Sequence, residues 1–158
     1  IKKIASLKEI NINQINADGN TVLHKETVLK NNELALLLMD FGADPTILDK
    51  EGKSFLFYCI SEGIKNISIL QKVVLLGYDI NSKNGQNKTL LMESINHYLN
   101  TPKDNVEIKN SHLEMIKELI HLGINVNALD NNNETLLFIL VFQELIRKFI
   151  EKPTCSNL

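Results

Sequence analysis

A short sequence pattern, in which a hydroxyl residue stands two positions before a leucine, occurs four times along the chain. The copies begin at Thr21, Ser54, Thr89 and Thr135, so that their spacings are 33, 35 and 46 residues. Self-similarity at a nearly fixed period constrains the architecture of a chain more than any single residue does. The pattern therefore predicts an array of repeated units, which builds an extended surface and argues against a catalytic pocket in this segment.

A second pattern, a glycine two positions before an aspartate or asparagine, follows each of the first three copies. It occurs at Gly42–Asp44, Gly77–Asp79 and Gly123–Asn125. A period of 33 residues with a hydroxyl-x-Leu start and a Gly-x-Asp stop resembles the ankyrin repeat. The resemblance extends from about Ile1 to about Ile150, nearly the whole length of the 158-residue chain.

The resemblance implies an all-α ankyrin-repeat solenoid, in which helix-turn-helix units stack side by side and β-turns project from one edge. We expect a single domain over 1–158. Its expected parts are a partial repeat at 1–15, repeats at about 16–48, 49–83 and 84–129, a terminal repeat at 130–151 and a tail at 152–158. The chain begins with Ile1, and the terminal repeat lacks the polar outer face of a capping repeat, so we expect further protein to flank the segment.

The third repeat carries an insertion, 98–111, between its two helices. The insertion is polar and includes Pro102, which predicts a surface loop. Lengthening a surface loop costs little free energy, and long loops in compact domains are often functional. The sequence leaves both readings open, a tolerated loop and a functional one.

Local signals at the helix ends favour helical hairpins. The hydroxyl of each repeat can cap a helix, because its oxygen can accept a hydrogen bond from an unpaired helical N–H. Gly42, Gly77 and Gly123 stand where a helix ends and the backbone turns left-handed. The second helices are expected from apolar residues at helical spacing. These residues are Leu34, Leu37, Leu38 and Phe41 around a helix over Glu33–Asp40, and Leu113, Ile116, Leu119 and Ile120 in the third repeat.

Turn signals separate the repeats. Asp49 to Gly52 has the signature of a type I turn, with aspartate first and glycine fourth. Asn87 and Asn133 take the place of that glycine in later repeats. The exchange is physically sensible, because asparagine tolerates the left-handed region better than most residues.

The chain departs from the ankyrin pattern in several places. Only the first copy keeps the histidine of the family's Thr-Pro-Leu-His signature, at His24, and no copy keeps the proline. The resemblance therefore implies a Thr–His polar network in the first repeat alone. Cys59 and Ser94 fit the family's preference for small residues on the inner helices. Glu26 does not fit, because an unpaired buried carboxylate is costly.

Composition argues against several classes of partner. The net charge of -2 and an aromatic content of 6% disfavour nucleic-acid binding. No apolar run is long enough for a membrane span, and the start lacks a signal-peptide pattern. Cys59 and Cys155 lie far apart, which suits a reducing compartment. We therefore expect a cytoplasmic location, or the host cytosol if the protein is a secreted effector. Abundant Asn, Ile and Lys are typical of AT-rich genomes, such as those of intracellular microbes and viruses.

The sequence holds no constellation typical of an enzyme or of a cofactor site. It has no glycine-rich phosphate loop and no nucleophile motif. His97, His112 and His121 have no metal-ligand spacing with the cysteines. Glu93 and His97 can share one helix face, but two ligands do not make a zinc site. We expect no metal, no cofactor and no catalysis.

The resemblance places the binding surface on the β-turn tips and on the exposed face of the first helix of each repeat. The expected tip residues are Asp18, Asn20, Lys50, Glu51, Lys53, Lys83, Gln86, Lys88, Asn131, Asn132 and Glu134. The expected inner-helix residues are Val28, Leu29, Ser61, Glu62, Asn96 and His97. Lys50, Lys53, Lys83 and Lys88 form a basic strip in this register. Such a strip either is an ordinary solvated surface or steers an acidic partner segment.

Two functions follow from this interpretation. The first is a protein–protein interaction module that holds a partner protein or peptide in a concave groove, within a microbial or viral effector. The second is an accessory or substrate-positioning domain of a larger multidomain enzyme. In either case we expect a monomer or a part of a larger chain, with no nucleic-acid or membrane partner.

Overall fold

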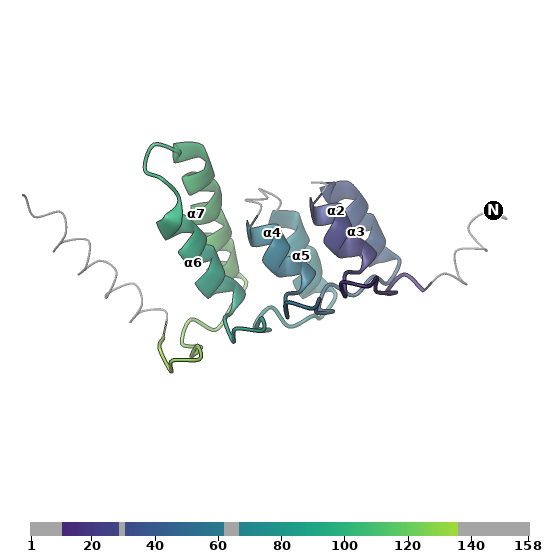
Figure 1. The fold of residues 1–158 in the computed structure, drawn as a ribbon. Coiled ribbons are helices and arrows are strands. Elements are labelled where there is room, and N and C mark those ends of the chain that lie inside the picture. Colours follow the sequence, from purple (N-terminus) through teal and green to yellow (C-terminus); the bar gives the residue numbers. More distant parts are fainter. Residues whose placement is uncertain (1–10, 29–30, 62–66, 136–158) are drawn as a thin grey trace, which may run out of the picture.

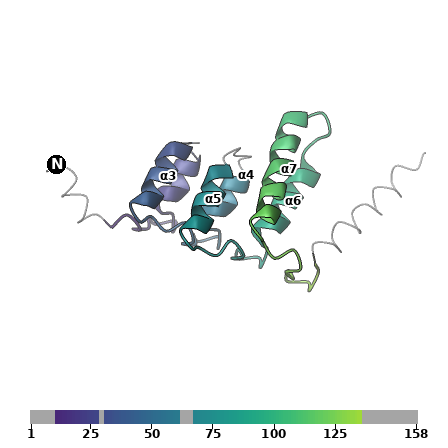
Figure 2. The same cartoon turned by 180° about the vertical axis from the view of Figure 1, so that it is seen from behind.

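A computed structural model describes residues 11–28, 31–61 and 67–135 of the chain. Its helices are α2 (Val22–Val28), α3 (Asn32–Asp40), α4 (Phe55–Ser61), α5 (Ile67–Leu75), α6 (Leu90–Asn100) and α7 (Val106–His121). They form antiparallel pairs that stack side by side, with α2, α4 and α6 in one layer and α3, α5 and α7 in the other (Figures 1 and 2). The expected all-α solenoid is therefore confirmed. The expected terminal repeat and tail lie outside the described residues from 136 onward.

The turn tips project along one edge of the stack (Figure 1). Each of three tips is fastened by a single antiparallel β-bridge, which joins the residues on either side of the turn. The bridges are Leu48 with Ser54, Lys83 with Thr89, and Leu129 with Thr135. The tips therefore recur in the register that the sequence pattern predicts.

The hydroxyl residues that open the repeats do not act alike. Thr89 caps α6, and its Oγ1 accepts a hydrogen bond from the N–H of Met92 at 3.3 Å, as predicted. Thr21 instead pairs its own N–H and hydroxyl with the Nδ1 atom of His24. The buried hydroxyl of Ser54 has no hydrogen-bond partner among the described residues. Side-chain capping by the repeat's first residue is thus confirmed for Thr89 and wrong for Ser54.

Glycine ends each outer helix as predicted. Gly42, Gly77 and Gly123 follow α3, α5 and α7 with φ of 92°, 80° and 82°. In each case the next residue's N–H reaches back to a carbonyl of the helix's last turn, as Ala43 does to Leu38 at 3.0 Å. These bonds use carbonyls that would otherwise lack partners at the helix end.

One continuous apolar core runs between the two helix layers. Its fully buried members come mainly from the second and third repeats, where Phe55, Leu56 and Leu90 are 0% exposed. Cys59 belongs to this core, as predicted. The core is contiguous across repeats because no single helical hairpin can cover its own apolar side.

The outer helices bury a different stripe from the one that their largest apolar residues indicate. In α3 the buried residues are Ala35 and Met39, whereas Leu37 is 50% exposed and Phe41, which caps the end of the helix, is 60% exposed. In α7 Leu119 is buried, but Ile120 is 51% exposed. Apolar spacing locates a helix correctly and cannot by itself decide which face a neighbour covers.

The insertion at 98–111 forms a helical extension, which corrects the expected surface loop. Helix α6 continues to Asn100 and α7 begins at Val106, so that only a short connection separates them. The side chain of Asn105 caps α7 by accepting from the N–H of Ile108 at 3.4 Å. Helix formation pairs backbone groups that a long polar loop would leave to solvent. The α6–α7 hairpin accordingly rises above its neighbours (Figure 1).

Within the described ranges, no helix combines the length and the apolar character needed to cross a membrane.

Candidate functional site

The same pair of side-chain-to-backbone hydrogen bonds closes each of the four described turn tips. The Oδ1 atom of the tip's first residue accepts hydrogen bonds from the backbone N–H groups two and four residues later. For Asp49 these bonds measure 2.8 and 2.9 Å, and for Asn84 3.0 and 2.9 Å. Asn16 and Asp130 make the same pair of bonds. Asparagine and aspartate suit this place because their short side chains can bond their own backbone two residues on.

The fourth residue of every tip adopts a left-handed conformation. Its φ is 79° at Gly19, 71° at Gly52, 60° at Asn87 and 59° at Asn133. The asparagines therefore replace glycine as the sequence predicts.

Neighbouring tips are also bonded to one another. The N–H of Lys50 donates to the carbonyl of Asp18 at 3.2 Å. The N–H of Gly85 donates to the carbonyl of Gly52 at 2.8 Å. The first three tips thus form a connected ledge, on which side chains keep fixed relative positions.

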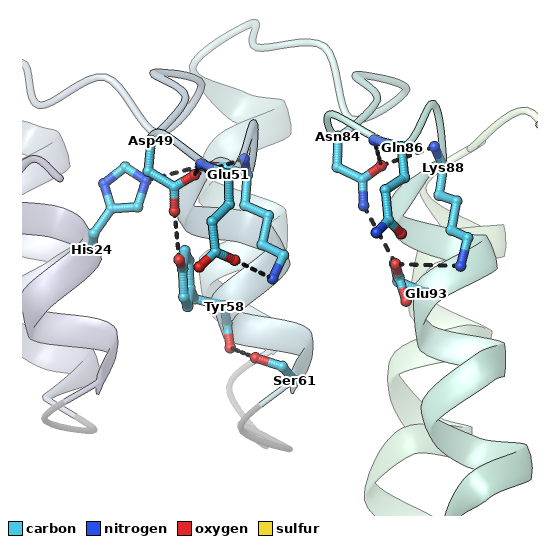
Figure 3. A network of polar contacts seen from close by, with 10 residues as sticks. His24, Asp49, Glu51, Tyr58, Ser61, Asn84, Gln86, Lys88 and Glu93 are labelled. Atoms are coloured by element: carbon cyan, nitrogen blue, oxygen red, sulfur yellow. Dashed lines mark hydrogen bonds and ion pairs between the residues drawn. The ribbon is translucent and has the colours of Figure 1, made fainter. Parts of the chain in front are cut away.

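A polar network joins the first repeat to the second (Figure 3). The Nε2 atom of His24 lies 3.3 Å from the carbonyl oxygen of Lys53, and the Tyr58 hydroxyl donates to Asp49. The rings of His24 and Tyr58 meet edge to face, with their centroids 5.7 Å apart. The predicted Thr–His network is therefore present in the first repeat, and it extends to the tip of the second.

The network shifts the pKa values of its members. Burial lowers the pKa of His24, against the opposing effects of the Lys53 carbonyl and the Asp49 charge. Burial alone would raise the pKa of Asp49, but hydrogen bonds from Tyr58, Lys53 and Glu51 outweigh it and hold that pKa below its usual value. Burial and the bond to Asp49 raise the pKa of Tyr58. The resting state is a neutral imidazole, a carboxylate and a protonated phenol.

A row of side chains runs along the inner-helix layer beneath the tips. Lys25, Tyr58 and Glu93 occupy the same place in successive repeats, four residues after Thr21, Ser54 and Thr89. Lys25 is exposed, and Tyr58 and Glu93 are half-buried. These three residues are not among the binding residues predicted from the sequence, although their constant spacing from the hydroxyl residue is visible in it.

The tips and this row contact each other. The Nζ atom of Lys53 lies 6.0 Å from the centroid of the Tyr58 ring. The Nζ atom of Lys88 lies 3.9 Å from Glu93 Oε1 (Figure 3). The side-chain amide of Asn84 also donates to Glu93, at 3.3 Å. The row therefore presents one aromatic ring and charges of both signs, and tip residues contact Tyr58 and Glu93.

The structure places all the predicted tip residues on the surface, each exposed or half-buried. Three of the four lysines of the expected basic strip contact groups of the chain itself. Lys53 pairs with Glu51 at 2.8 Å, Lys88 pairs with Glu93, and Lys83 donates to the carbonyl of Leu129 at 2.9 Å. The strip is therefore less positive than its lysines alone indicate.

The predicted inner-helix residues are only partly placed. Ser61 is exposed, and Asn96 is half-buried and accepts from Asn100 at 2.9 Å. The half-buried ring of His97 stacks on His112 of α7, with centroids 5.6 Å apart. The side chain of Val28 is not described, and Leu29 and Glu62 lie outside the described residues.

Among the described residues, no group of three or more His, Cys, Asp or Glu side chains could hold a metal ion. The arrangement instead offers hydrogen-bond donors and acceptors, an aromatic ring and paired charges on an extended face. These groups are suited to contact with another macromolecule.

Comparison with known proteins gives relatives built from the same repeat. Ankyrin repeat and SOCS box protein 6 of Homo sapiens is 27% identical over 122 residues, which cover 77% of this chain and 27% of the relative. An ankyrin repeat protein of Acanthamoeba polyphaga mimivirus is 25% identical over 142 residues, with 78% and 18% covered. Notch-regulated ankyrin repeat-containing protein A of Danio rerio is 37% identical over 59 residues, with 37% and 53% covered. No protein-family model matches the chain.

The repeat register and the stacked helical hairpins are those of an ankyrin-repeat solenoid, and these relatives make the chain similar to ankyrin-repeat proteins. This similarity supports a protein–protein interaction module as the general class of the chain. It spans only 27% and 18% of the length of the human and viral relatives.

Proposed function

We propose that the chain binds a partner protein, or an extended peptide of one, across its turn tips and the inner-helix layer formed by α2, α4 and α6. The observation that carries the proposal is the ledge of hydrogen-bonded tips above the row of Lys25, Tyr58 and Glu93. Side chains that are already ordered lose less conformational entropy on binding, so a rigid ledge favours tight association.

Tyr58 is the expected centre of the contact. Its hydroxyl is held by Asp49, and Lys53 lies over its ring. Rigid aromatic side chains with one polar end are over-represented among the residues that dominate binding energy. Charged neighbours such as Lys25 and Glu93 set the orientation of a partner more than its affinity.

Charge reversal on the tips tests the proposal. The triple variant Lys50→Glu, Lys53→Glu, Lys88→Glu would serve as bait beside the wild type in affinity capture from cell lysate, followed by quantitative mass spectrometry. A triple variant with the same charge change on the α6–α7 hairpin, Lys103→Glu, Lys109→Glu, Lys117→Glu, is the matched control. Circular dichroism would first show that all three proteins are helical.

We expect a protein that is captured by the wild type and the control and lost by the tip variant. Equal capture by the wild type and the tip variant would contradict binding at the tips. Loss with the α6–α7 control alone would move the site to that hairpin.

The biological setting belongs to the same proposal. The abundance of Asn, Ile and Lys, which is typical of AT-rich genomes, and the mimivirus relative support a cytoplasmic host-interaction or effector role. The competing proposal is an accessory domain of a larger protein, which is favoured by the small share of its relatives that the chain spans. The human relative's name pairs ankyrin repeats with a SOCS box, so that such an arrangement has a precedent. Sequencing of the full-length gene would separate the two, since a catalytic motif beyond residue 158 is expected only of an accessory domain.

A further inference from the structure

Asn84 and Gly85 form the one Asn-Gly dipeptide in the sequence, and they stand at the start of the third turn tip, residues 84–88. Asn-Gly is the asparagine dipeptide most prone to spontaneous deamidation, because glycine has no side chain that hinders its backbone nitrogen from attacking the asparagine side chain. Three separate requirements of the fold place this reactive pair in the tip.

The first requirement is the pair of hydrogen bonds that closes the tip. The Oδ1 atom of Asn84 accepts from the N–H of Gln86 at 3.0 Å and from that of Lys88 at 2.9 Å (Figure 3). Only asparagine or aspartate occupies this place in the four described tips. Both have a short side chain whose oxygen reaches the backbone two residues on.

The second requirement decides between asparagine and aspartate. The side-chain amide of Asn84 donates to Glu93, nine residues later, at 3.3 Å. In the second tip Asp49 instead accepts from the hydroxyl of Tyr58, which is also nine residues later. An amide at 84 therefore matches the acceptor that α6 presents, whereas a carboxylate there would repel the charge of Glu93.

The third requirement is for glycine at 85. A Cβ on Gly85 would lie 2.8 Å from the carbonyl oxygen of Glu51 and 3.3 Å from the Cα of Gly52, both in the second tip. The N–H of Gly85 also donates to the carbonyl of Gly52 at 2.8 Å. The contact between the second and third tips thus leaves no room for a side chain at this place.

We propose that Asn84 is a deamidation site, which the contact between the second and third tips keeps unreactive. In the reaction the backbone nitrogen of Gly85 forms a bond to Cγ of Asn84. The Cγ–Nδ2 bond of Asn84 breaks, and Nδ2 leaves as ammonia with the proton that Gly85 gives up. Water then opens the succinimide ring and leaves either aspartate or isoaspartate at 84.

The contact between the tips protects the site because the reaction removes groups that the folded tip uses. The nitrogen of Gly85 carries no proton in the succinimide, so its hydrogen bond to Gly52 must be lost as the ring forms. The hydrogen bond from Asn84 to Glu93 is lost with the ammonia. A site that reacts only after local opening reacts at a rate set by the free energy of that opening.

The two products change the tip in different ways. Aspartate at 84 retains the oxygen that closes the tip, as Asp49 and Asp130 do in theirs, but it places a second carboxylate beside Glu93. Isoaspartate lengthens the backbone by one carbon, which shifts the N–H groups of the tip relative to the side chain. Either product adds a negative charge to the ledge of the proposed function, although the chemistry itself does not depend on that function.

Peptide mapping by mass spectrometry measures the reaction in the full chain at mildly alkaline pH, where a backbone nitrogen loses its proton more readily. The wild type is compared in buffer, in guanidinium chloride and with two variants in buffer. Gly52→Ala forces the tips apart, because its Cβ would lie 2.6 Å from the Cα of Gly85. Gly77→Ala is the matched control, since Gly77 is also left-handed but a Cβ there would meet no atom within 4 Å.

We expect Asn84 to deamidate about tenfold or more slowly in the folded wild type than in the unfolded chain. We also expect it to react faster in Gly52→Ala than in Gly77→Ala. Equal rates in the folded and unfolded wild type, or equal rates in the two variants, would overturn the proposal. So would an unfolded chain in which Asn84 reacts no faster than the other asparagines.

The added charge has its own test in a double-mutant cycle. Asn84→Asp is expected to lower the urea midpoint of the wild type and to lower it less beside Glu93→Gln, where the facing carboxylate is absent. Equal lowering in both backgrounds would overturn the assigned repulsion. None of these measurements uses a binding partner, so that failure here is distinguishable from failure of the proposed function.

Discussion

Gly52 and Gly77 both have a left-handed backbone conformation, but other atoms lie close to Gly52 and not to Gly77. Their φ values are 71° and 80°. A Cβ on Gly52 would lie 2.6 Å from the Cα of Gly85 in the next tip, whereas a Cβ on Gly77 would meet no atom within 4 Å. The glycine of the tip is thus required by contact between repeats, and the glycine of the helix end by conformation alone.

Substitution of each glycine by alanine distinguishes the cost of backbone conformation from the cost of contact between repeats. Gly77→Ala is expected to lower the free energy of unfolding by about 1–2 kcal/mol, the cost of a left-handed L-residue. Gly52→Ala is expected to lower it further, because backbone atoms of the adjacent tip must move. Urea denaturation followed by circular dichroism measures both. Equal losses would show that the tips are not in close contact.

The histidine of the first repeat makes stability depend on pH. Burial holds the pKa of His24 below 6.5, its usual value in an unfolded chain, and burial and the nearby His97 do the same for His112. As the pH falls through 6.5 the unfolded chain takes up protons that the folded chain does not, so the free energy of unfolding falls. The free energy of unfolding stops falling once the pH is below the pKa values of these histidines in the folded chain.

Denaturation at pH 7.5 and 5.5 tests this dependence. His24→Gln is expected to lose less stability between the two pH values than the wild type, whatever its stability at pH 7.5. His121→Gln, at an exposed histidine that ends α7, is the control and should follow the wild type. An unaltered pH dependence in His24→Gln would contradict the assigned role of burial.

Residues whose role is local are predictable from the sequence. The left-handed Asn87 and Asn133 and the helix-ending glycines follow from backbone conformation, which depends on the residue and its neighbours. The state of the tip lysines does not follow. Lys83 reaches the carbonyl of Leu129, 46 residues away, and only the stacking of repeats brings these two groups together.

Helix capping differs between equivalent positions, and a matched pair of variants tests the difference. Thr89 caps α6, whereas the hydroxyl of Ser54 at the start of α4 is buried and unpaired among the described residues. Thr89→Ala is expected to cost about 1 kcal/mol. Ser54→Ala is expected to be neutral or stabilising, because it removes a buried polar atom that makes no bond.

Thermal and urea unfolding of the two variants measures these changes. Thr89→Ser is the control for the first variant, since it retains the capping oxygen and loses only a methyl group. A loss at Ser54→Ala as large as that at Thr89→Ala would show that Ser54 caps its helix in solution.

At the scale of elements, the sequence predicts the hairpins but not the length of the third. The insertion at 98–111 contains a proline and many polar residues, which favour a loop. The helical signal comes from Asn105 as a cap and from Ile108, His112 and Met115, which share one face of α7. A buried histidine interrupts the apolar pattern of that face, so hydropathy alone does not extend the stripe back to Ile108.

At the scale of the whole molecule, the order of the repeats is readable from the sequence because each unit carries its own start and stop. The exposure of the apolar residues of the first hairpin is not readable in this way. Leu37 and Phe41 have the spacing of core residues, yet they are 50% and 60% exposed. Burial in a solenoid is decided by the neighbouring unit, which a repeat pattern does not specify.

The central claim is that a partner protein contacts the tips and the inner-helix layer. Hydrogen–deuterium exchange of the chain, alone and with the captured partner, tests it most directly. We predict slower exchange in the tips and in α2, α4 and α6, with little change in α3, α5 and α7. Slowing confined to α3, α5 and α7, with the tips unaffected, would contradict the claim.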